Sequence, residues 1–523
     1  MRYLSNECSK SIPGKNQEVF RIFGPPGTGK TTTLLNMVDE ALEAGTHPHR
    51  IAFLAFTRKA ANEAKERAAA RFELDPKTDL IHFRTIHSLA LNMTDIRSEQ
   101  VMQEAHFREL SQSIGVSLGG SKTANFDDDL PSVVASSDPI LGLINLARLR
   151  KVPLRMQYNI SNLEADWNTV SYVDKCLREY KQSMGLYDFT DMLVAFVEGA
   201  DRFCPQFDLC FLDEAQDLSP LQWEMAHAID DHSKRMYCAG DDDQAIYRWA
   251  GADVDHFINL PGGSETLSQS YRVPKAIHSL AEDVVKRISR RFPKKYEPKP
   301  EAGNVTRINT ITALDMSEGS WLILSQAGYQ LQPVARDLKS SGYLFEYRGH
   351  RSISEKLSDS VNGWEQLRQG LEVSGEVARK IYTFMSTGNR VARGFKKLSG
   401  LGDTDLVTMG TLVDSYGLRA DKSMIWSEAM DKLPDVDRAY ITALLRRGEK
   451  FNGVPRITAS TIHGSKGGEA DNVVLFTDLS PAAEKEMRVN PQDMHRVFYV
   501  AITRAKANLF IIDAEDVTRS YEL

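Results

Sequence analysis

The residues best suited to chemistry form a glycine-rich loop near the N-terminus. The loop comprises Gly24, Pro25, Pro26, Gly27, Thr28, Gly29, Lys30 and Thr31, and Thr32 follows it. Its spacing matches G-x-x-x-x-G-K-[ST], in which backbone N–H groups surround phosphate oxygens. We expect the whole run, Thr32 included, to bind a nucleotide. Lys30 would reach the β- and γ-phosphates, and the Thr31 hydroxyl would bind Mg²⁺.

The segments around this loop support that interpretation. Val19–Phe23 predicts a buried strand, and Thr31–Ala44 predicts a helix with apolar residues along one face. The N-terminus of such a helix adds partial positive charge beside the phosphates. A glycine-rich turn before an ordinary helix is the alternative. It is disfavoured because all four fixed positions match in a strand–loop–helix context.

A second group of polar residues follows another apolar strand, Leu209–Leu212. Asp213-Glu214-Ala215-Gln216-Asp217 stands directly after it. A strand of this kind delivers carboxylates to the sheet edge that carries the phosphate loop. Asp213 would hold Mg²⁺, and Glu214 would orient and deprotonate an attacking water. A solvated acidic turn is the alternative, and the nearby phosphate loop argues against it.

A third candidate segment, Gly240–Trp249, follows the strand Met236–Ala239. Gln244 could sense the γ-phosphate through its neutral amide. Tyr247 and Trp249 are aromatic residues in a loop at the ligand edge, where they could stack on unpaired bases. Packing between two domains is an equally weighted alternative for these two rings.

The composition limits the class of protein. The chain has 523 residues, 42% of them hydrophobic and 26% charged, and a net charge of −7. This length predicts several domains, and the acidic balance argues against a general coat for nucleic acid but permits a local basic groove. The five cysteines form no C-x-x-C pair, which predicts neither zinc nor disulfides. No signal peptide or membrane-length apolar run is recognisable, so we expect a cytoplasmic protein of a bacterium or a virus-infected cell.

Strand and helix patterns alternate from Val19 to about Leu89, which predicts a doubly wound parallel sheet. Polar, helix-rich stretches interrupt this rhythm twice. We therefore expect an α/β protein with two lobes, each carrying a mostly helical insertion. The predicted segments are 1–91 and 185–261 for the first lobe, 92–184 for its insertion, 262–350 and 453–523 for the second lobe, and 351–452 for its insertion.

Taken together, these motifs resemble those of superfamily 1 DNA helicases of the UvrD/Rep/PcrA type. The resemblance extends from Gly24 to Lys506, with the motifs in family order. They are Gly24–Thr31, Ala55–Ala61, Thr85–Ser88, Asp213–Asp217, Gly240–Gly251, Gln269–Arg272, Thr461–Glu469 and Phe498–Lys506. It implies two RecA-like P-loop lobes that close on ATP.

The resemblance also implies roles that spacing alone does not. Arg272 and Arg504 correspond to two arginine fingers of the second lobe, with surface ion pairing as the alternative. Tyr271 corresponds to the ring that stacks on adenine, and Glu469 to the acid that binds the ribose. The positions that line the single-strand groove in the family are Phe56, Thr85, His87, Tyr247, Trp249 and His463. For the two histidines, capping of a helix or turn is the alternative.

Three departures from the family pattern stand out. Gln17 is too close to Gly24 for the usual adenine-reading geometry, which leaves specificity for ATP open. Ala250 replaces a frequent arginine. Ser325-Gln326 stands where the family often has arginine or asparagine facing DNA.

The expected function is a Mg²⁺- and ATP-dependent helicase that moves 3′ to 5′ on single-stranded DNA and opens duplexes at single-strand/double-strand junctions. One alternative is a translocase that strips bound proteins but unwinds poorly. Another is a non-enzymatic DNA-binding scaffold, which the intact set of motif residues disfavours. An RNA-directed motor is a weaker alternative, although no residue pattern reads the 2′-hydroxyl in a way that excludes RNA.

Overall fold

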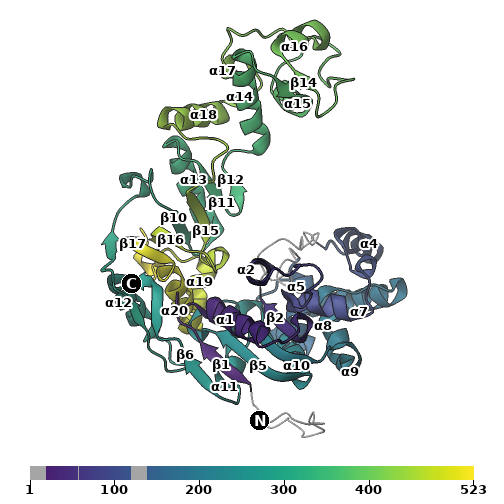
Figure 1. The fold of residues 1–523 in the computed structure, drawn as a ribbon, viewed down its shortest axis with the longest axis vertical. Helices are drawn as coiled ribbons and strands as arrows, with labels where there is room; N and C mark the ends of the chain where they lie inside the picture. Colours follow the sequence, from purple (N-terminus) through teal and green to yellow (C-terminus); the bar gives the residue numbers. More distant parts are fainter. Residues whose placement is uncertain (1–18, 57, 119–137) are drawn as a thin grey trace. The chain divides into compact units, whose positions relative to one another are not determined.

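The computed structural model describes residues 19–56, 58–118 and 138–523. Gln17, Cys8 and the motif residue Thr57 lie outside these ranges. The chain divides into two compact units (Figure 1). The first extends to Gly303 and includes Lys485–Thr503, whereas the second comprises Asn304–Glu484 and Arg504–Leu523. The chain therefore passes between the units after Gly303, Glu484 and Thr503.

The first unit is built on a parallel sheet with the order β3-β2-β4-β5-β1-β6. Neighbouring strands β1, β5 and β6 lie side by side in Figure 1. Every residue of β2 is buried, as expected for a strand covered on both faces. The strands are β1 Phe20–Phe23, β2 Ile51–Ala55, β3 Phe83–Thr85, β4 Phe207–Leu212, β5 Ser233–Gly240 and β6 Ser264–Thr266.

Helices pack on this sheet through their apolar faces. In α1, Leu34, Leu35 and Val38 are buried, and they belong to the same core as Ile51 and Phe53 of β2. The α-helices of the first unit outside its helical segment are α1 Lys30–Glu43, α2 Arg58–Phe72, α3 Ile86–Met93, α8 Phe189–Glu198, α9 Ala200–Phe203, α10 Pro220–Asp231, α11 Val254–Asn259, α12 Lys275–Val285 and α20 Pro491–Ile502.

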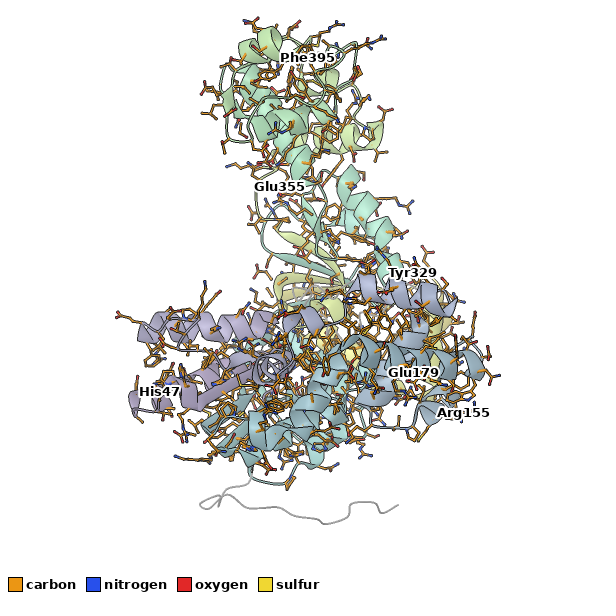
Figure 2. The ribbon with its side chains drawn as sticks, turned by 90° about the vertical axis from the view of Figure 1, so that its right-hand side faces the viewer. His47, Arg155, Glu179, Tyr329, Glu355 and Phe395 are labelled. Carbon is orange, nitrogen blue, oxygen red and sulfur yellow. The ribbon has the colours of Figure 1, made fainter. Side chains whose placement is uncertain are left out.

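A helical segment between α3 and α8 has a core of its own. Ile144, Val170, Val173 and Leu177 are buried in it. Arg155 and Glu179 mark this segment in Figure 2. Its helices are α4 Glu104–Ile114, α5 Pro139–Leu149, α6 Leu154–Asn159 and α7 Trp167–Met184.

The first compact unit extends beyond the expected lobe boundary at residue 262. The strand β6 continues the first sheet, with Ile22 opposite Glu265 and Phe23 opposite Thr266. The helix α12 then packs against α20 in the same unit. Two short strands, β7 Gln269–Pro274 and β8 Glu297–Lys299, pair with each other before the chain leaves this unit at Gly303.

The second unit contains another large sheet, with the order β12-β11-β15-β10-β16-β17-β9. Its pairs are parallel except for β11 with β12. The α/β class with two large parallel sheets is therefore confirmed. The strands are β9 Asn304–Arg307, β10 Trp321–Ser325, β11 Phe345–Tyr347, β12 His350–Arg351, β15 Ile457–Thr461, β16 Ala470–Phe476 and β17 Ala505–Ile512.

Helices account for most of the remainder of the second unit. Glu355 and Phe395 mark this region in Figure 2. Trp364 of α14 is fully buried, and its indole N–H donates to Met424 O at 2.9 Å. The elements are α13 Leu331–Ser340, α14 Glu355–Arg368, α15 Gly375–Thr383, α16 Met409–Tyr416, α17 Trp426–Ala429, α18 Asp435–Arg447 and the strand pair β13 Val373–Ser374 and β14 Leu406–Val407. One further helix, α19 Pro481–Val489, spans the unit division at Glu484.

The apolar helices and the cysteines of the described residues bear on membrane spans and disulfides. Across these ranges, no helix combines the length and apolar character that a membrane crossing requires. Cys176, Cys204, Cys210 and Cys238 are free thiols.

Replacing Trp364 by alanine should destabilise the second unit by about 3–5 kcal/mol, because it removes the largest side chain of α14 and leaves a cavity. Hydrogen exchange of the α14 and α15 amides measures this loss. Leu371→Ala is the control, since Leu371 is 53% exposed and should change stability by about 0.5 kcal/mol or less. Equal protection losses in the two variants would contradict the packing described here.

Candidate nucleotide-binding site

The predicted phosphate loop connects β1 to α1. Lys30 Nζ donates to Gly24 O at 3.0 Å, so the lysine folds back over the loop. A Cβ on Gly24 would lie 1.8 Å from Lys30 Cγ, and Gly27 and Gly29 have φ of +71° and +82°. Glycine is therefore required at these positions by space or by backbone conformation. Thr28 stabilises the turn by donating its hydroxyl to Pro25 O at 2.8 Å.

The acidic residues after β4 lie beside this loop. Thr31 Oγ1 donates to Asp213 Oδ2 at 2.7 Å, and Lys30 Nζ lies 3.7 Å from Glu214 Oε1. Asp213 is 1% exposed. Burial and the Glu214 carboxylate raise the pKa of Asp213 to about 6, while Lys30 and the Thr31 hydroxyl act to lower it. A cation bound here would stabilise the ionised form of this carboxylate.

Glu214 adopts an uncommon backbone conformation, with φ of +54°. Strained backbone of this kind concentrates at functional sites. The buried amide of Gln216 holds the Glu214 side chain, because Gln216 Nε2 donates to Glu214 Oε2 at 2.6 Å. The same amide accepts from the Asp241 backbone N–H at 3.0 Å. Gln216 thus connects the acid after β4 to the loop after β5.

Gln244 lies in a short helix, η4 Asp242–Gln244, directly after β5. Its Nε2 donates to Asp241 Oδ2 at 2.7 Å, and its side chain is buried. A buried amide held by a buried carboxylate has a defined orientation, as a residue that senses a phosphate requires.

Arg272 lies in the same unit as Lys30, which differs from its expected place in the second lobe. The segment β7 packs on the phosphate loop: Ser270 Oγ donates to Pro26 O at 2.7 Å, and the Tyr271 N–H donates to Gly27 O at 2.8 Å. A Cβ on Gly27 would lie 2.3 Å from Arg272 Cβ. The Tyr271 side chain is 75% exposed and is free of covering side chains over most of its surface.

Arg504 and Glu469 belong to the second unit. Arg504 Nη1 donates to Gly468 O at 3.2 Å, and the Ala470 N–H donates to Arg504 O at 3.1 Å. Glu469 forms an ion pair with Lys506, with 3.7 Å between Nζ and Oε1. The pairing of β16 with β17 therefore brings these two predicted nucleotide residues together, and Arg504 is largely buried.

The aromatic residues predicted to contact bases differ in exposure. Tyr247 is only 4% exposed, and its ring stacks on Phe56 with 5.5 Å between centroids. Trp249 is 49% exposed, with its ring 6.5 Å from that of Tyr247. In this structure Tyr247 packs inside the first unit, whereas about half of the Trp249 surface is exposed to solvent.

The remaining predicted DNA residues lie in separate elements. Thr85 is the N-cap of α3 and accepts from the Ser88 N–H at 3.2 Å, so His87 does not cap this helix. Burial lowers the pKa of His87 to about 4, which keeps the imidazole neutral near pH 7. His463 begins the short helix η8 His463–Ser465 of the second unit.

Two residues of the site were not predicted from sequence. Gln216 belongs to the acidic motif. Its position between Glu214 and Asp217 in the sequence was the only signal that its amide could bind a carboxylate. Lys294 contacts the aspartates after β5 from 52 positions away, at 2.6 Å from Asp242 Oδ1. No local pattern indicates such a contact, because a lysine in a polar stretch is usually exposed.

Replacing Gly240 by alanine should lower the free energy of unfolding by about 1–3 kcal/mol, because the new Cβ has no room. It would lie 2.5 Å from Gln216 Oε1 and 2.9 Å from Phe257 Cζ. Urea denaturation measures the change. Gly142→Ala in α5 is the matched control. A Cβ there meets nothing within 4 Å, and alanine should stabilise the helix by about 0.5–1 kcal/mol. Equal stability of the two variants would contradict the close packing of Gln216.

Two protein-family models match the chain. The model of the UvrD/REP helicase N-terminal domain matches residues 5–262, and that of the UvrD-like helicase C-terminal domain matches residues 427–516.

Several curated proteins are similar in sequence. The ATP-dependent DNA helicase PcrA of Bacillus subtilis is 27% identical over 328 residues, which cover 56% of this chain and 42% of PcrA. PcrA of Leuconostoc citreum is 29% identical over 288 residues, covering 52% and 38%. The putative ATP-dependent DNA helicase YjcD of Bacillus subtilis is 25% identical over 429 residues, covering 78% and 55%. The chain spans about half the length of the curated relatives it matches.

Among solved structures, the PRRSV helicase aligns with 97% of this chain and 54% of its own, at 12% identity and a TM-score of 0.33. The two family models carry the assignment. Since they match in N- to C-terminal order and together cover more than half of its length, the chain belongs to the UvrD/REP helicase family.

Proposed function

We propose that this protein is an ATP-dependent motor that moves 3′ to 5′ along single-stranded DNA and unwinds duplex DNA. The main support is the arrangement of Lys30, Thr31, Asp213 and Glu214 around one phosphate loop. The names of its relatives, which are ATP-dependent DNA helicases, agree with this proposal. The Gly240–Gly251 segment resembles the 3′-to-5′ group of the family and motivates the polarity.

The oxygen donors beside the loop suit Mg²⁺. Thr31 offers a hydroxyl and Asp213 a carboxylate, which are the hard ligands this ion prefers. Among the described residues, no group of three or more His, Cys, Asp or Glu side chains is placed to hold a metal ion. Mg²⁺ is commonly bound by one or two protein ligands together with substrate phosphates. When bound, it would neutralise charge on the β- and γ-phosphates.

Each side chain of the site has a proposed task in hydrolysis. Lys30 binds the phosphates, and Glu214 orients the attacking water and accepts its proton. Gln244 senses the γ-phosphate, and Arg272 stabilises charge that develops on it. Tyr271 stacks on the base. We propose, from the resemblance, that Arg504 and Glu469 also bind the nucleotide.

DNA binding is proposed to depend on stacking, which tolerates any sequence because every base has a π-face. Trp249 is the strongest candidate, since half of its surface is exposed. Phe56, Thr85, His87 and His463 are proposed as further lining residues of the strand path. Tyr247 would act mainly by supporting this surface from below.

The proposal is tested by ATP turnover with and without single-stranded DNA, and by unwinding of duplexes with a 3′ or a 5′ tail. Wild-type protein should show DNA-stimulated turnover and should open the 3′-tailed duplex. Turnover without unwinding would instead favour a translocase that removes bound proteins. Absence of turnover would favour a DNA-binding scaffold.

Replacing Glu214 by glutamine should reduce kcat by about 10²–10⁴-fold, because an amide cannot accept the proton of the attacking water. ATP binding, followed with a fluorescent analogue, should persist because Lys30 is unchanged. Glu265→Gln is the control, since this exposed residue of β6 is also a glutamate. Wild-type turnover of the Glu214 variant would remove that residue from catalysis.

Replacing Trp249 by alanine should weaken single-strand binding by about 1–3 kcal/mol, the usual contribution of one stacked base. Fluorescence anisotropy with a labelled oligonucleotide measures the affinity. Tyr172→Ala provides the matched control, because Tyr172 of α7 is 48% exposed and has no proposed contact with DNA. Unchanged affinity in the Trp249 variant would mean that the strand path lies elsewhere.

A further inference from the structure

A buried ammonium group lies among three carboxylates beside the candidate site. The Lys294 side chain is 1% exposed. Its Nζ lies 3.0 Å from Asp241 Oδ1, 2.6 Å from Asp242 Oδ1 and 2.6 Å from Asp243 Oδ2. All three aspartates directly follow β5, and each is 1% exposed or less. One lysine is therefore the shared counter-ion of a whole turn.

Other groups of the first unit fix the rest of this turn. Arg291 binds Asp243 through two hydrogen bonds, at 2.8 Å from Nε to Oδ1 and 2.6 Å from Nη2 to Oδ2. The Phe292 N–H donates to Asp242 Oδ2 at 2.7 Å. Arg496 of α20 is fully buried and donates to Asp242 O at 2.9 Å and to Arg290 O at 2.7 Å. The turn is thus held from residues 290–294 and from α20.

Asp241 extends this cluster to two of the proposed catalytic side chains. Its Oδ2 accepts from Gln244 Nε2 at 2.7 Å. Its backbone N–H donates to Gln216 Oε1 at 3.0 Å, and Gln216 Nε2 donates to Glu214 Oε2 at 2.6 Å. An ion pair and one hydrogen bond therefore connect Lys294 to Gln244. Two further hydrogen bonds connect the Asp241 backbone to Glu214 through Gln216.

Stability alone does not account for this arrangement. Burying an ion cluster is costly, and apolar residues of similar volume are often at least as stabilising. Two carboxylates of the cluster also differ in the direction of their pKa shifts. Burial raises the pKa of Asp242, whereas Lys294 and Arg291 outweigh burial and lower that of Asp243. Without Lys294, three adjacent buried carboxylates would share one arginine, and at least one would take up a proton.

We propose that Lys294 is a positioning residue for ATP hydrolysis, which holds Asp241 in place so that its carboxylate orients Gln244 and its backbone N–H orients Gln216 and, through it, Glu214. This inference rests on the proposed ATPase function. Among the described residues, the hydrogen bond and ion pairs of Lys294 go to the three aspartates and not to the phosphate loop. Its effect on turnover would therefore be indirect.

The test compares Lys294→Met with Lys295→Met, a neighbouring exposed lysine. We expect Lys294→Met to lower kcat of DNA-stimulated ATP hydrolysis by about tenfold or more, while KM for ATP and affinity for single-stranded DNA stay within about twofold. Lys295→Met should match wild type. The double variant Lys294→Met/Asp242→Asn should regain part of the lost kcat, because removal of one carboxylate reduces the repulsion among the adjacent buried aspartates that Lys294 otherwise balances. Thermal unfolding is measured for each variant.

The outcomes separate this inference from the proposed function. Inactive wild-type protein would contradict the ATPase itself. Active wild type with an unaffected Lys294→Met variant would overturn the positioning role alone. A parallel loss of kcat, ATP affinity, DNA affinity and unfolding temperature, without recovery in the double variant, would also overturn it and leave Lys294 a structural residue. If Lys294→Met does not fold, the double variant decides: a folded double variant with near-wild-type KM and partly retained kcat supports the proposal, and an unfolded or inactive one contradicts it.

Discussion

The register of three parallel strands determines where the candidate catalytic groups of the first unit lie. β1, β4 and β5 are neighbours and end at the same edge of the sheet. The Gly24 N–H donates to Gly240 O at 2.9 Å, and the Asp213 N–H donates to Leu54 O at 2.8 Å. The phosphate loop, the acidic pair and the turn that holds Gln244 therefore meet because the backbone ladder places the ends of their strands together. A shift of one residue in any of these strands would reverse its side chains.

The two groups of buried carboxylates at this edge differ in how their charge is balanced. Asp241, Asp242 and Asp243 have Lys294 and Arg291 as counter-ions within the same fold. Asp213 has the Thr31 hydroxyl as a hydrogen-bond partner, and burial and Glu214 raise its pKa to about 6. The first group is compensated by the protein and suits a scaffold. The second is compensated only in part, which suits a position that meets an external cation.

Local sequence patterns predicted the groups whose contacts lie close in the chain or follow from strand order. The phosphate loop, the strand before Asp213 and the α/β class are of this kind. The patterns could not predict that β6 joins the first sheet, because the pairing of Arg21 with Ser264 links distant parts of the chain. This pairing carries Arg272 into the unit of Lys30. They also could not separate Tyr247 from Trp249, since both are aromatic residues of one loop and only packing on Phe56 distinguishes them. The role of Lys294 could not be predicted either, because its aspartate partners are about 50 positions away in the sequence.

Because Arg272 lies in the first unit, fewer of the predicted nucleotide residues can connect a bound nucleotide to the second unit. A ligand shifts an equilibrium between conformations only as far as its interactions differ between them. Lys30 and Arg272 lie within one compact unit, so their contacts with a nucleotide would belong to that unit alone. Of the predicted nucleotide residues, Arg504 and Glu469 belong to the second unit. If ATP drives a motor here, Arg504 and Glu469 are therefore the predicted nucleotide residues that could supply the differential contact, because Arg272 shares a unit with Lys30.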